Sequence, residues 1–250
     1  MICIFRKIYP KRFGFFQNFG NEFVSTTHKL KFTAADGKKY LTDALDSIGI
    51  VDLARQFPNN KAMAFVDWFI YSDNTIDGQS KKKAYSFFES NLIANKDVGT
   101  IKSLQQIHAY IFGGLYDFAG KIRQKNIAKG GFQFAMAMFL DNTLKQIEQM
   151  PENTFDEIVN KYVEMNVAHP FMEGNGRSTR MWLDLIFKKQ LKKCVDWSKI
   201  NKNDYLNAMI VSHANSSEIK RLLENALTTE INSCEMYMKG IDYSYYYEEN

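Results

Sequence analysis

Apolar residues that recur every three or four positions constrain the fold of this chain more than any other feature. Over residues 101–115, and again over 155–166, they mark one face of an amphipathic helix. Residues 122–134 instead alternate around Gly130-Gly131, which predicts a small β-hairpin. Further helices are predicted over Ala135–Met150, Arg177–Leu191, Asn203–Ser212 and Glu218–Leu227. We therefore predict an all-α helical bundle that carries one β-hairpin.

The first 74 residues lack this regular period. Short helices are predicted at Thr42–Leu45 and over Lys61–Tyr71, and Asn74–Gly78 is typical of a turn or linker. We therefore expect two parts, an N-terminal segment at 1–74 and a helical domain at 75–250.

Composition excludes several classes of protein. The 32 basic and 28 acidic residues leave a net charge of only +4, so no direct nucleic-acid binding is inferred. No apolar run reaches the roughly 18–20 residues that span a bilayer, so no membrane partner is expected. The three cysteines, Cys3, Cys194 and Cys234, are far apart, which is typical of reduced thiols. The expected location is cytoplasmic.

The segment His169–Arg180, with the sequence HPFMEGNGRSTR, carries the candidate chemistry. Gly174-Asn175-Gly176 permits backbone angles that are closed to other residues, so its N–H groups can converge on an anion at the start of the next helix. His169 has a side chain suited to accepting a proton near neutral pH. Glu173 offers the hard oxygen ligand that Mg²⁺ prefers.

Two arginines complete this pattern. Arg177 and Arg180 are three residues apart, so both guanidinium groups project from one face of the first helical turn. Without an anion, two cations at a helix N-terminus are unfavourable. Together with the glycine-rich turn they predict a polyphosphate site and a phosphoryl or nucleotidyl transfer reaction. Taken singly, each residue has an ordinary structural explanation as a turn, a helix end or a solvated face.

The complete run HPFMEGNGR resembles the signature of Fic-domain proteins, and the resemblance extends over roughly residues 75–250. Most proteins with this loop are adenylyltransferases, which move AMP from ATP to a Ser, Thr or Tyr hydroxyl of a target protein. The related Doc kinases carry Ala and Lys in place of Gly174 and Gly176. The resemblance therefore implies a Fic-type bundle, a hairpin that forms a flap, ATP as co-substrate and Mg²⁺ as cofactor.

The resemblance also implies roles for individual residues. His169 would be the general base, Glu173 the Mg²⁺ ligand, and Arg180 the residue that clamps the γ-phosphate. The flap would hold the target strand by backbone pairing. The nucleotide-binding residues implied are Lys129, Gly130, Gly131, Phe132, Asn166, Val167, Gly174, Asn175, Gly176, Arg177, Ser178, Thr179, Arg180 and Leu206.

The C-terminal residues 244–248 resemble the inhibitory helix at the end of small class III Fic proteins. Ser244 and Glu248 would share one face of a helix at about 240–250, and Glu248 would pair bidentately with Arg180 in place of the γ-phosphate. Glu249 stands where the family has Gly or Asn. Tyr245 is a candidate self-modification site. The structural alternative is that the tyrosines only pack a terminal helix against the core.

Several assignments stay open on the sequence alone. One enzymatic alternative is AMP removal, with Glu248 positioning water, and another is a non-catalytic regulatory or antitoxin-like binding protein. The expected partner is a target protein, with a bacterial topoisomerase subunit as a first trial, and a homo-oligomer is an option. Residues 29–71 resemble part of a Bro-type antirepressor module, without its DNA-binding front. His108 is predicted to be a hydrogen-bonded core histidine.

Overall fold

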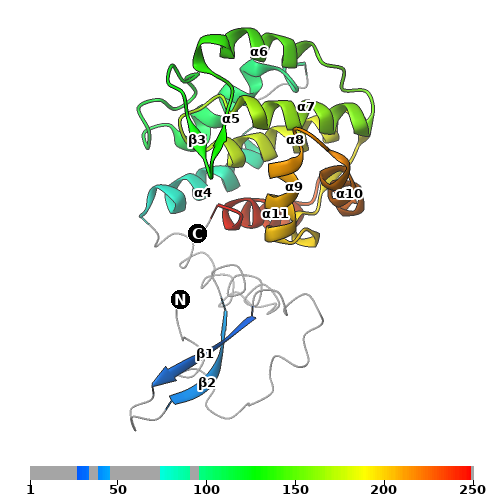
Figure 1. Ribbon diagram of the computed structural model, residues 1–250. Coiled ribbons are helices and arrows are strands. Elements are labelled where there is room, and N and C mark those ends of the chain that lie inside the picture. Colours follow the sequence, from blue (N-terminus) through cyan, green and yellow to red (C-terminus); the bar gives the residue numbers. More distant parts are fainter. Residues whose placement is uncertain (1–26, 34–38, 46–73, 91–95, 249–250) are drawn as a thin grey trace. The chain divides into compact units, whose positions relative to one another are not determined.

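A computed structural model describes residues 27–33, 39–45, 74–90 and 96–248 of this chain (Figure 1). The chain divides into two compact units, Met1–Ser72 and Asp73–Asn250.

The described part of the first unit is an antiparallel pair of strands, β1 (Thr27–Thr33) and β2 (Lys39–Leu45). The helix predicted at Thr42–Leu45 is therefore wrong. Backbone pairing with β1, in which Thr42 lies opposite Leu30, overrides the weak local preference of four residues. The helix predicted over Lys61–Tyr71 and most of the segment compared with the antirepressor module lie outside the described residues.

The second unit is mainly helical, as predicted. Its described α-helices are α4 (Ile76–Ser86), α5 (Ile101–Phe112), α6 (Ala137–Gln149), α7 (Phe155–Ala168), α8 (Asn175–Leu191), α9 (Lys202–Val211), α10 (Ser217–Ala226) and α11 (Cys234–Tyr246). Two short 3₁₀ turns, η3 (Phe87–Glu89) and η4 (Trp197–Lys199), join them. The helices predicted within residues 101–227 all exist, with ends that differ by up to three residues.

Helix α8 lies at the centre of this bundle. It packs against α5, α7 and α11, and Figure 1 shows α6 on the outer side of α7. Trp182, Leu183, Ile186 and Phe187 on α8 are fully buried. Because a buried apolar face fixes the rotation of a helix about its axis, this packing sets where the polar first turn of α8 points.

Helices α4 and α11 are fastened to each other through Asp242. This buried carboxylate on α11 accepts hydrogen bonds from the hydroxyl of Tyr85 and, at 2.9 Å, from Nζ of Lys81, both on α4. The turn predicted over Asn74–Gly78 is wrong, because Thr75 caps α4 by accepting from the backbone N–H of Gly78. The chain thus enters the second unit directly in a helix.

The predicted hairpin is present as β3 (Ala128–Lys129) and β4 (Phe132–Gln133), with Gly130 and Gly131 in its turn. A second short pair, β5 (Cys194–Val195) with β6 (Leu227–Thr228), was not predicted, because two residues per strand give no alternating pattern. None of the helices in the described residues is long and apolar enough to span a bilayer.

Candidate functional site

The segment between α7 and α8 is a closed loop. Helix α7 ends before His169, which adopts left-handed backbone angles (φ 48°, ψ 64°) ahead of Pro170. The side-chain amide of Asn175 accepts from the N–H of Phe171 and donates to its carbonyl, both at 2.7 Å. Asn175 therefore closes the loop with its side chain and leaves only its backbone N–H available to an anion.

Gly174 allows this loop to pack on α5. It has φ 76°, and a Cβ built at this position overlaps the ring of Phe112. Gly174 is also the N-cap of α8, so the backbone N–H groups of residues 175–177 have no acceptor within the helix. The positive end of the α8 dipole therefore faces the loop, as the sequence predicts.

The hydrogen bonds of His169 define its tautomer. Nδ1 lies 2.9 Å from the carbonyl oxygen of Asn166, which can only accept, so Nδ1 carries the proton and Nε2 is the basic nitrogen. Burial lowers the pKa of His169 to about 4, although the contact with Asn166 opposes this shift. Phe134 stacks on the imidazole at 3.7 Å. His169 is therefore a neutral, oriented base at physiological pH.

Arg123 fixes the end of α7 that carries His169. Its side chain is buried and donates to the carbonyl of His169 at 2.8 Å and to that of Ala168 at 3.1 Å. A guanidinium at the C-terminus of a helix satisfies carbonyls that lack partners within it and complements the helix dipole. This contact positions the left-handed residue that begins the loop.

His108 supports the same loop from α5. Its Nδ1 accepts from the N–H of Gly120 at 2.8 Å, so Nε2 carries the proton and donates to the carbonyl of Glu173 at 2.9 Å. Burial lowers the pKa of His108 to about 4, and the ring stacks on Phe171 at 3.8 Å. The prediction of a hydrogen-bonded core histidine is confirmed, and the residue also positions the backbone beside the predicted metal ligand.

Arg177 is buried and enclosed by opposite charge and aromatic rings. Its guanidinium pairs with Asp77 in the first turn of α4 and contacts Glu173 at 3.4 Å. It lies 4.9 Å from the centre of the Phe112 ring and 5.3 Å from that of Tyr245. Its Nε atom is buried and has no hydrogen-bond partner. Arg177 therefore keeps a donor that an incoming anion can satisfy.

The C-terminal segment occupies Arg180. Nε donates to the hydroxyl of Ser244 at 2.8 Å, while Nη2 donates to the carbonyl of Ser244 at 2.7 Å and to Glu248 at 2.6 Å. Nη1 donates to the hydroxyl of Tyr205 at 3.3 Å, and that hydroxyl lies 2.5 Å from the hydroxyl of Tyr162. Arg180 is only 2% exposed, so these contacts satisfy a cation that water scarcely reaches.

Glu248 links the C-terminal segment to α8 and to the hairpin. Burial alone would raise the pKa of its carboxyl, but the Arg180 guanidinium outweighs this and the pKa is lowered. One oxygen contacts Arg180, and the other lies 3.8 Å from Nζ of Lys129 at the hairpin. The predicted bidentate pairing is wrong, because Ser244 takes the second prong of the guanidinium. The predicted helix at 240–250 also differs, since α11 spans 234–246 and Glu248 follows in a turn.

Some predicted nucleotide contacts are not available as side chains. The buried hydroxyls of Ser178 and Thr179 donate to the carbonyls of Gly174 and Asn175, four residues back in each case. Leu206 differs from these two residues, because it lies on α9 with its side chain 37% exposed and therefore accessible. The ring of Tyr245, the candidate self-modification site, is buried, so its hydroxyl is not accessible while α11 is docked.

The remaining predicted residues border the loop. The carbonyl of Asn166 accepts from His169, and that of Val167 accepts from the N–H of Ala135, which leads from the hairpin into α6. The hairpin itself presents Lys129, Gly130, Gly131 and the half-buried Phe132.

Sequence reasoning missed four residues that complete the site: Asp77, Arg123, Tyr162 and Tyr205. Asp77 and Tyr205 lie about 100 and 25 residues from the arginines they contact. No local pattern identifies such partners, although Arg123 ends the run Phe118–Arg123, which is similar to the segment that leads into the flap in Fic-domain proteins.

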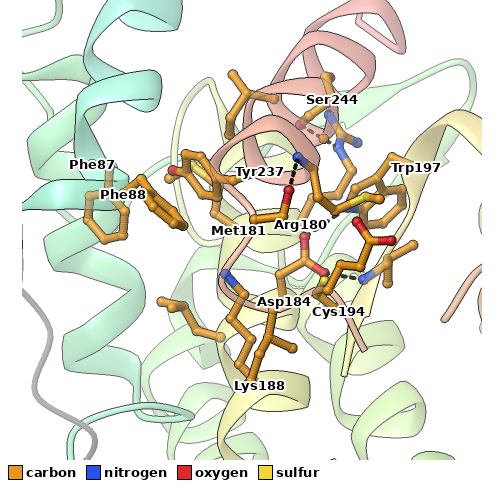
Figure 2. A pocket seen from close by; sticks show the side chains of 18 of the residues that line it. Phe87, Phe88, Arg180, Met181, Asp184, Lys188, Cys194, Trp197, Tyr237 and Ser244 are labelled. Atoms are coloured by element: carbon orange, nitrogen blue, oxygen red, sulfur yellow. Dashed lines mark hydrogen bonds between the residues drawn. The ribbon is translucent and has the colours of Figure 1, made fainter. Parts of the chain in front are cut away.

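Figure 2 shows Arg180 and Ser244 at one end of a cavity of about 360 Å³ next to α8 and α11. Its wall includes Asp184, whose carboxylate accepts from the N–H of Val195 and from Nε1 of Trp197. Burial raises the pKa of Asp184 to about 6. Apart from Arg180 and Ser244, no residue that lines this cavity belongs to the predicted site.

The residues present fit a magnesium ion only in a limited way. No cluster of three His, Cys, Asp or Glu side chains occurs within the described ranges. Glu173 is an exposed carboxylate beside the α8 N-terminus, and its Oε1 accepts from the N–H of Gly174 at 3.0 Å. Mg²⁺ is commonly held by one or two carboxylates together with substrate phosphates, so one protein ligand is compatible with a nucleotide-bound ion.

The sequence of the helical unit is similar to that of known proteins. Residues 99–187 match the model of the Fic/DOC family. The protein adenylyltransferase VbhT of Bartonella schoenbuchensis is 26% identical over 194 residues, which cover 73% of this chain and 36% of VbhT. The probable protein adenylyltransferase y4lH of Sinorhizobium fredii is 25% identical over 134 residues, which cover 47% of this chain and 69% of that protein. This chain thus spans about a third of the length of VbhT.

Solved structures show the same fold. The BepC protein of Bartonella tribocorum, crystallised with AMPPNP, superposes with a TM-score of 0.54 at 20% identity over 69% of this chain and 92% of that one. The FIC domain of Bep8 from Bartonella sp. 1-1C gives 0.55 at 16% identity over 71% and 90%. The helical unit of this chain therefore has the fold of these Fic domains, and its residues 99–187 match the Fic/DOC family.

Proposed function

We propose that this chain is a protein adenylyltransferase, which moves AMP from Mg-ATP to a Ser, Thr or Tyr hydroxyl of a target protein and is restrained by its own Glu248. The observation that carries the proposal is the pair of buried arginines beside the α8 N-terminus. Arg177 and Arg180 are 4% and 2% exposed, and they contact carboxylates of the same chain, Asp77 and Glu248 respectively. Relatives named protein adenylyltransferase support it further.

The arginine environment suits a polyphosphate. Arg177 has an unpartnered buried Nε, and the N–H groups that open α8 lie next to it along the chain. Planar guanidinium groups bind phosphate oxygens in pairs, and the helix dipole adds to their attraction. In the absence of nucleotide, Asp77, Glu173 and Glu248 supply the negative charge that ATP phosphates would supply when bound.

In this proposal His169 acts as the general base. Its Nε2 would take the proton of the target hydroxyl as that oxygen forms a bond to the α-phosphorus of ATP. The bond from the α-phosphorus to the bridging oxygen then breaks, and pyrophosphate leaves with the electron pair. The lowered pKa of His169 keeps Nε2 unprotonated, and the hydrogen bond to Asn166 keeps it oriented. Mg²⁺, held by Glu173 and the phosphates, would neutralise charge on the leaving group.

Glu248 accounts for the restraint. Its contact with Arg180, together with those of Ser244, uses every nitrogen of the guanidinium except the one that contacts Tyr205. A γ-phosphate cannot bind Arg180 at the same place as a carboxylate 2.6 Å away. ATP would then bind without the clamp that aligns its α-phosphorus, which lowers transfer without abolishing nucleotide binding.

The test is incorporation of label from α-³²P-ATP with Mg²⁺. The forms compared are the wild type, Glu248→Gly, and Glu248→Gly combined with His169→Ala, each alone and with bacterial lysate or purified topoisomerase subunits. Label should rise with Glu248→Gly and vanish in the double variant. Glu218→Gly, which removes an exposed ion pair on α10, is the matched control and should behave as the wild type. Absence of label in every form that binds ATP would refute the transferase.

AMP removal is the second candidate, because the Glu248 carboxylate is close enough to His169 to act on its pKa. A carboxylate beside the base could orient a water for attack on an AMP-modified hydroxyl. This activity would be lost with Glu248→Gly, whereas transfer would rise. Incubation of a pre-labelled target with both forms separates the two reactions, and a parallel experiment with γ-³²P-ATP tests kinase activity. A non-catalytic regulator would show neither reaction.

A further inference from the structure

The exposed apolar side chains of the second unit are concentrated on two helices. Seven large apolar residues of the described part are strongly exposed. Three lie at the start of α6 and three on α9, and only Ile76 on α4 lies elsewhere. The six are Met136, Met138, Phe139, Leu206, Ile210 and Val211. Single exposed apolar residues are ordinary on a protein surface, but groups of them are typical of interaction sites.

The hairpin connects the two groups. The chain runs from β4 through Phe134 and Ala135 into Met136, so the α6 group begins three residues after the flap strand. On the other side, the ring of Phe132 in β4 lies 5.2 Å from that of His213, which follows α9 by two residues. Both apolar groups therefore border the same two-residue strand.

The candidate base lies next to this strand. Phe134, directly after β4, stacks on His169 at 3.7 Å. A hydroxyl that reaches Nε2 of His169 must therefore approach beside the hairpin. Within the described residues, β3 and β4 pair only with each other, so each keeps an edge with unpaired backbone groups. An extended peptide can pair with such an edge.

We infer that the α6 group and the α9 group are docking sites for apolar side chains on either side of the modified hydroxyl in an extended segment of the target protein. The inference rests on the proposed function and adds the chemistry of the target segment. An extended segment rises about 3.3 Å per residue and directs alternate side chains to the same face. It can therefore pair with the flap and reach both helices at once.

Two observations favour a protein segment over a membrane or a second copy of this chain. A strand edge beside the apolar groups offers N–H and C=O partners, which a peptide backbone satisfies and lipid chains do not. The two groups are also divided by the hairpin and its exposed Lys129, so they do not form one continuous apolar face. This division suits separate side chains that flank a central residue.

The test uses Glu248→Gly as the active background, with a library of 13-residue peptides that carry one central Ser, Thr or Tyr and randomised flanks. Label from α-³²P-ATP is measured for each peptide. Two variants disrupt the groups, Met138→Lys/Phe139→Glu on α6 and Ile210→Lys/Val211→Glu on α9. Ile76→Lys is the control, since Ile76 is an exposed apolar residue (40%) on α4 that belongs to neither group. Binding of Mg-ADP by calorimetry checks that each variant is folded.

Labelled peptides should be enriched in large apolar residues on both sides of the modified hydroxyl. Each group variant should reduce peptide labelling at least tenfold and remove the apolar preference on one side only, with Mg-ADP binding unchanged. Ile76→Lys should leave both unaffected. Equal labelling by the group variants and the control would overturn the inference, as would an active enzyme that labels itself or lysate proteins but no peptide. Failure to label anything would instead refute the proposed function.

Discussion

Neutralising Glu248 should destabilise the protein more than neutralising a surface glutamate in an equally short ion pair. The Glu248–Arg180 and Glu218–Arg221 contacts are both 2.6 Å. The first pair is 23% and 3% exposed, whereas the second is 48% and 58% exposed. Glu248→Gln removes the charge that compensates a buried guanidinium, while Glu218→Gln removes one that water replaces.

The size of the effect follows from what remains around Arg180. Removing one partner of a fully buried pair typically costs about 3–5 kcal/mol. Arg180 keeps its contacts with Ser244 and Tyr205, and the glutamine can still accept a hydrogen bond, so we expect about 2 kcal/mol. For a unit of this size that corresponds to a fall of about 4–8 °C in melting temperature. Glu218→Gln should leave the melting temperature unchanged.

The assay is thermal unfolding with and without Mg-ATP. Ligand at a hundred times its dissociation constant stabilises a folded protein by about 2.7 kcal/mol. In Glu248→Gln the γ-phosphate would meet Arg180 without competition, so Mg-ATP should raise the melting temperature more than it does in the wild type. The reasoning is refuted if Glu248→Gln and Glu218→Gln have the same melting temperature. It is also refuted if Mg-ATP raises the melting temperatures of both variants and of the wild type equally.

Three further predictions concern the loop. A Cβ at position 176 overlaps the end of the Glu248 side chain, which can move away, so Gly176→Ala should raise AMP transfer. A Cβ at position 174 overlaps the ring of Phe112, so Gly174→Ala should instead lower both the thermal stability and AMP transfer. Because the pKa of His169 is about 4 in the folded protein, AMP transfer by the Glu248→Gly form should persist down to about pH 5. A fall in transfer near pH 6.5 would contradict a buried, neutral base. His108 and His169 both have lowered pKa values, so between pH 4 and 6.5 the unfolded chain binds more protons than the folded protein. The free energy of unfolding should therefore decrease as pH falls through that range. His108→Gln should make the urea midpoint of unfolding less dependent on pH in the same range.

The sequence predicts the bundle because its helices are long and strongly periodic, and burial of one face determines them. The loop from His169 to Arg180 is predictable for a different reason, since glycines, a proline and charges each have a local effect on the backbone. Contacts made over long sequence distances are not predictable in this way. The pairing of Arg177 with Asp77 and of Arg180 with Tyr205 depends on how α4 and α9 pack, which no short pattern specifies. The antiparallel pairing of Thr42 with Leu30 spans a shorter distance in the sequence, but it too depends on a second segment and outweighs the local preference of residues 42–45.

The Asp242 contact between α4 and α11 determines how far this domain can be shortened. The family match covers residues 99–187, yet α4 and α11 lie outside it on opposite sides. A fragment cut to the matched residues would lose Asp77, Ser244 and Glu248 together and leave two buried guanidinium groups without compensating charge. The segment that must be kept for folding is therefore longer than the region that matches the family, and its two flanks depend on each other.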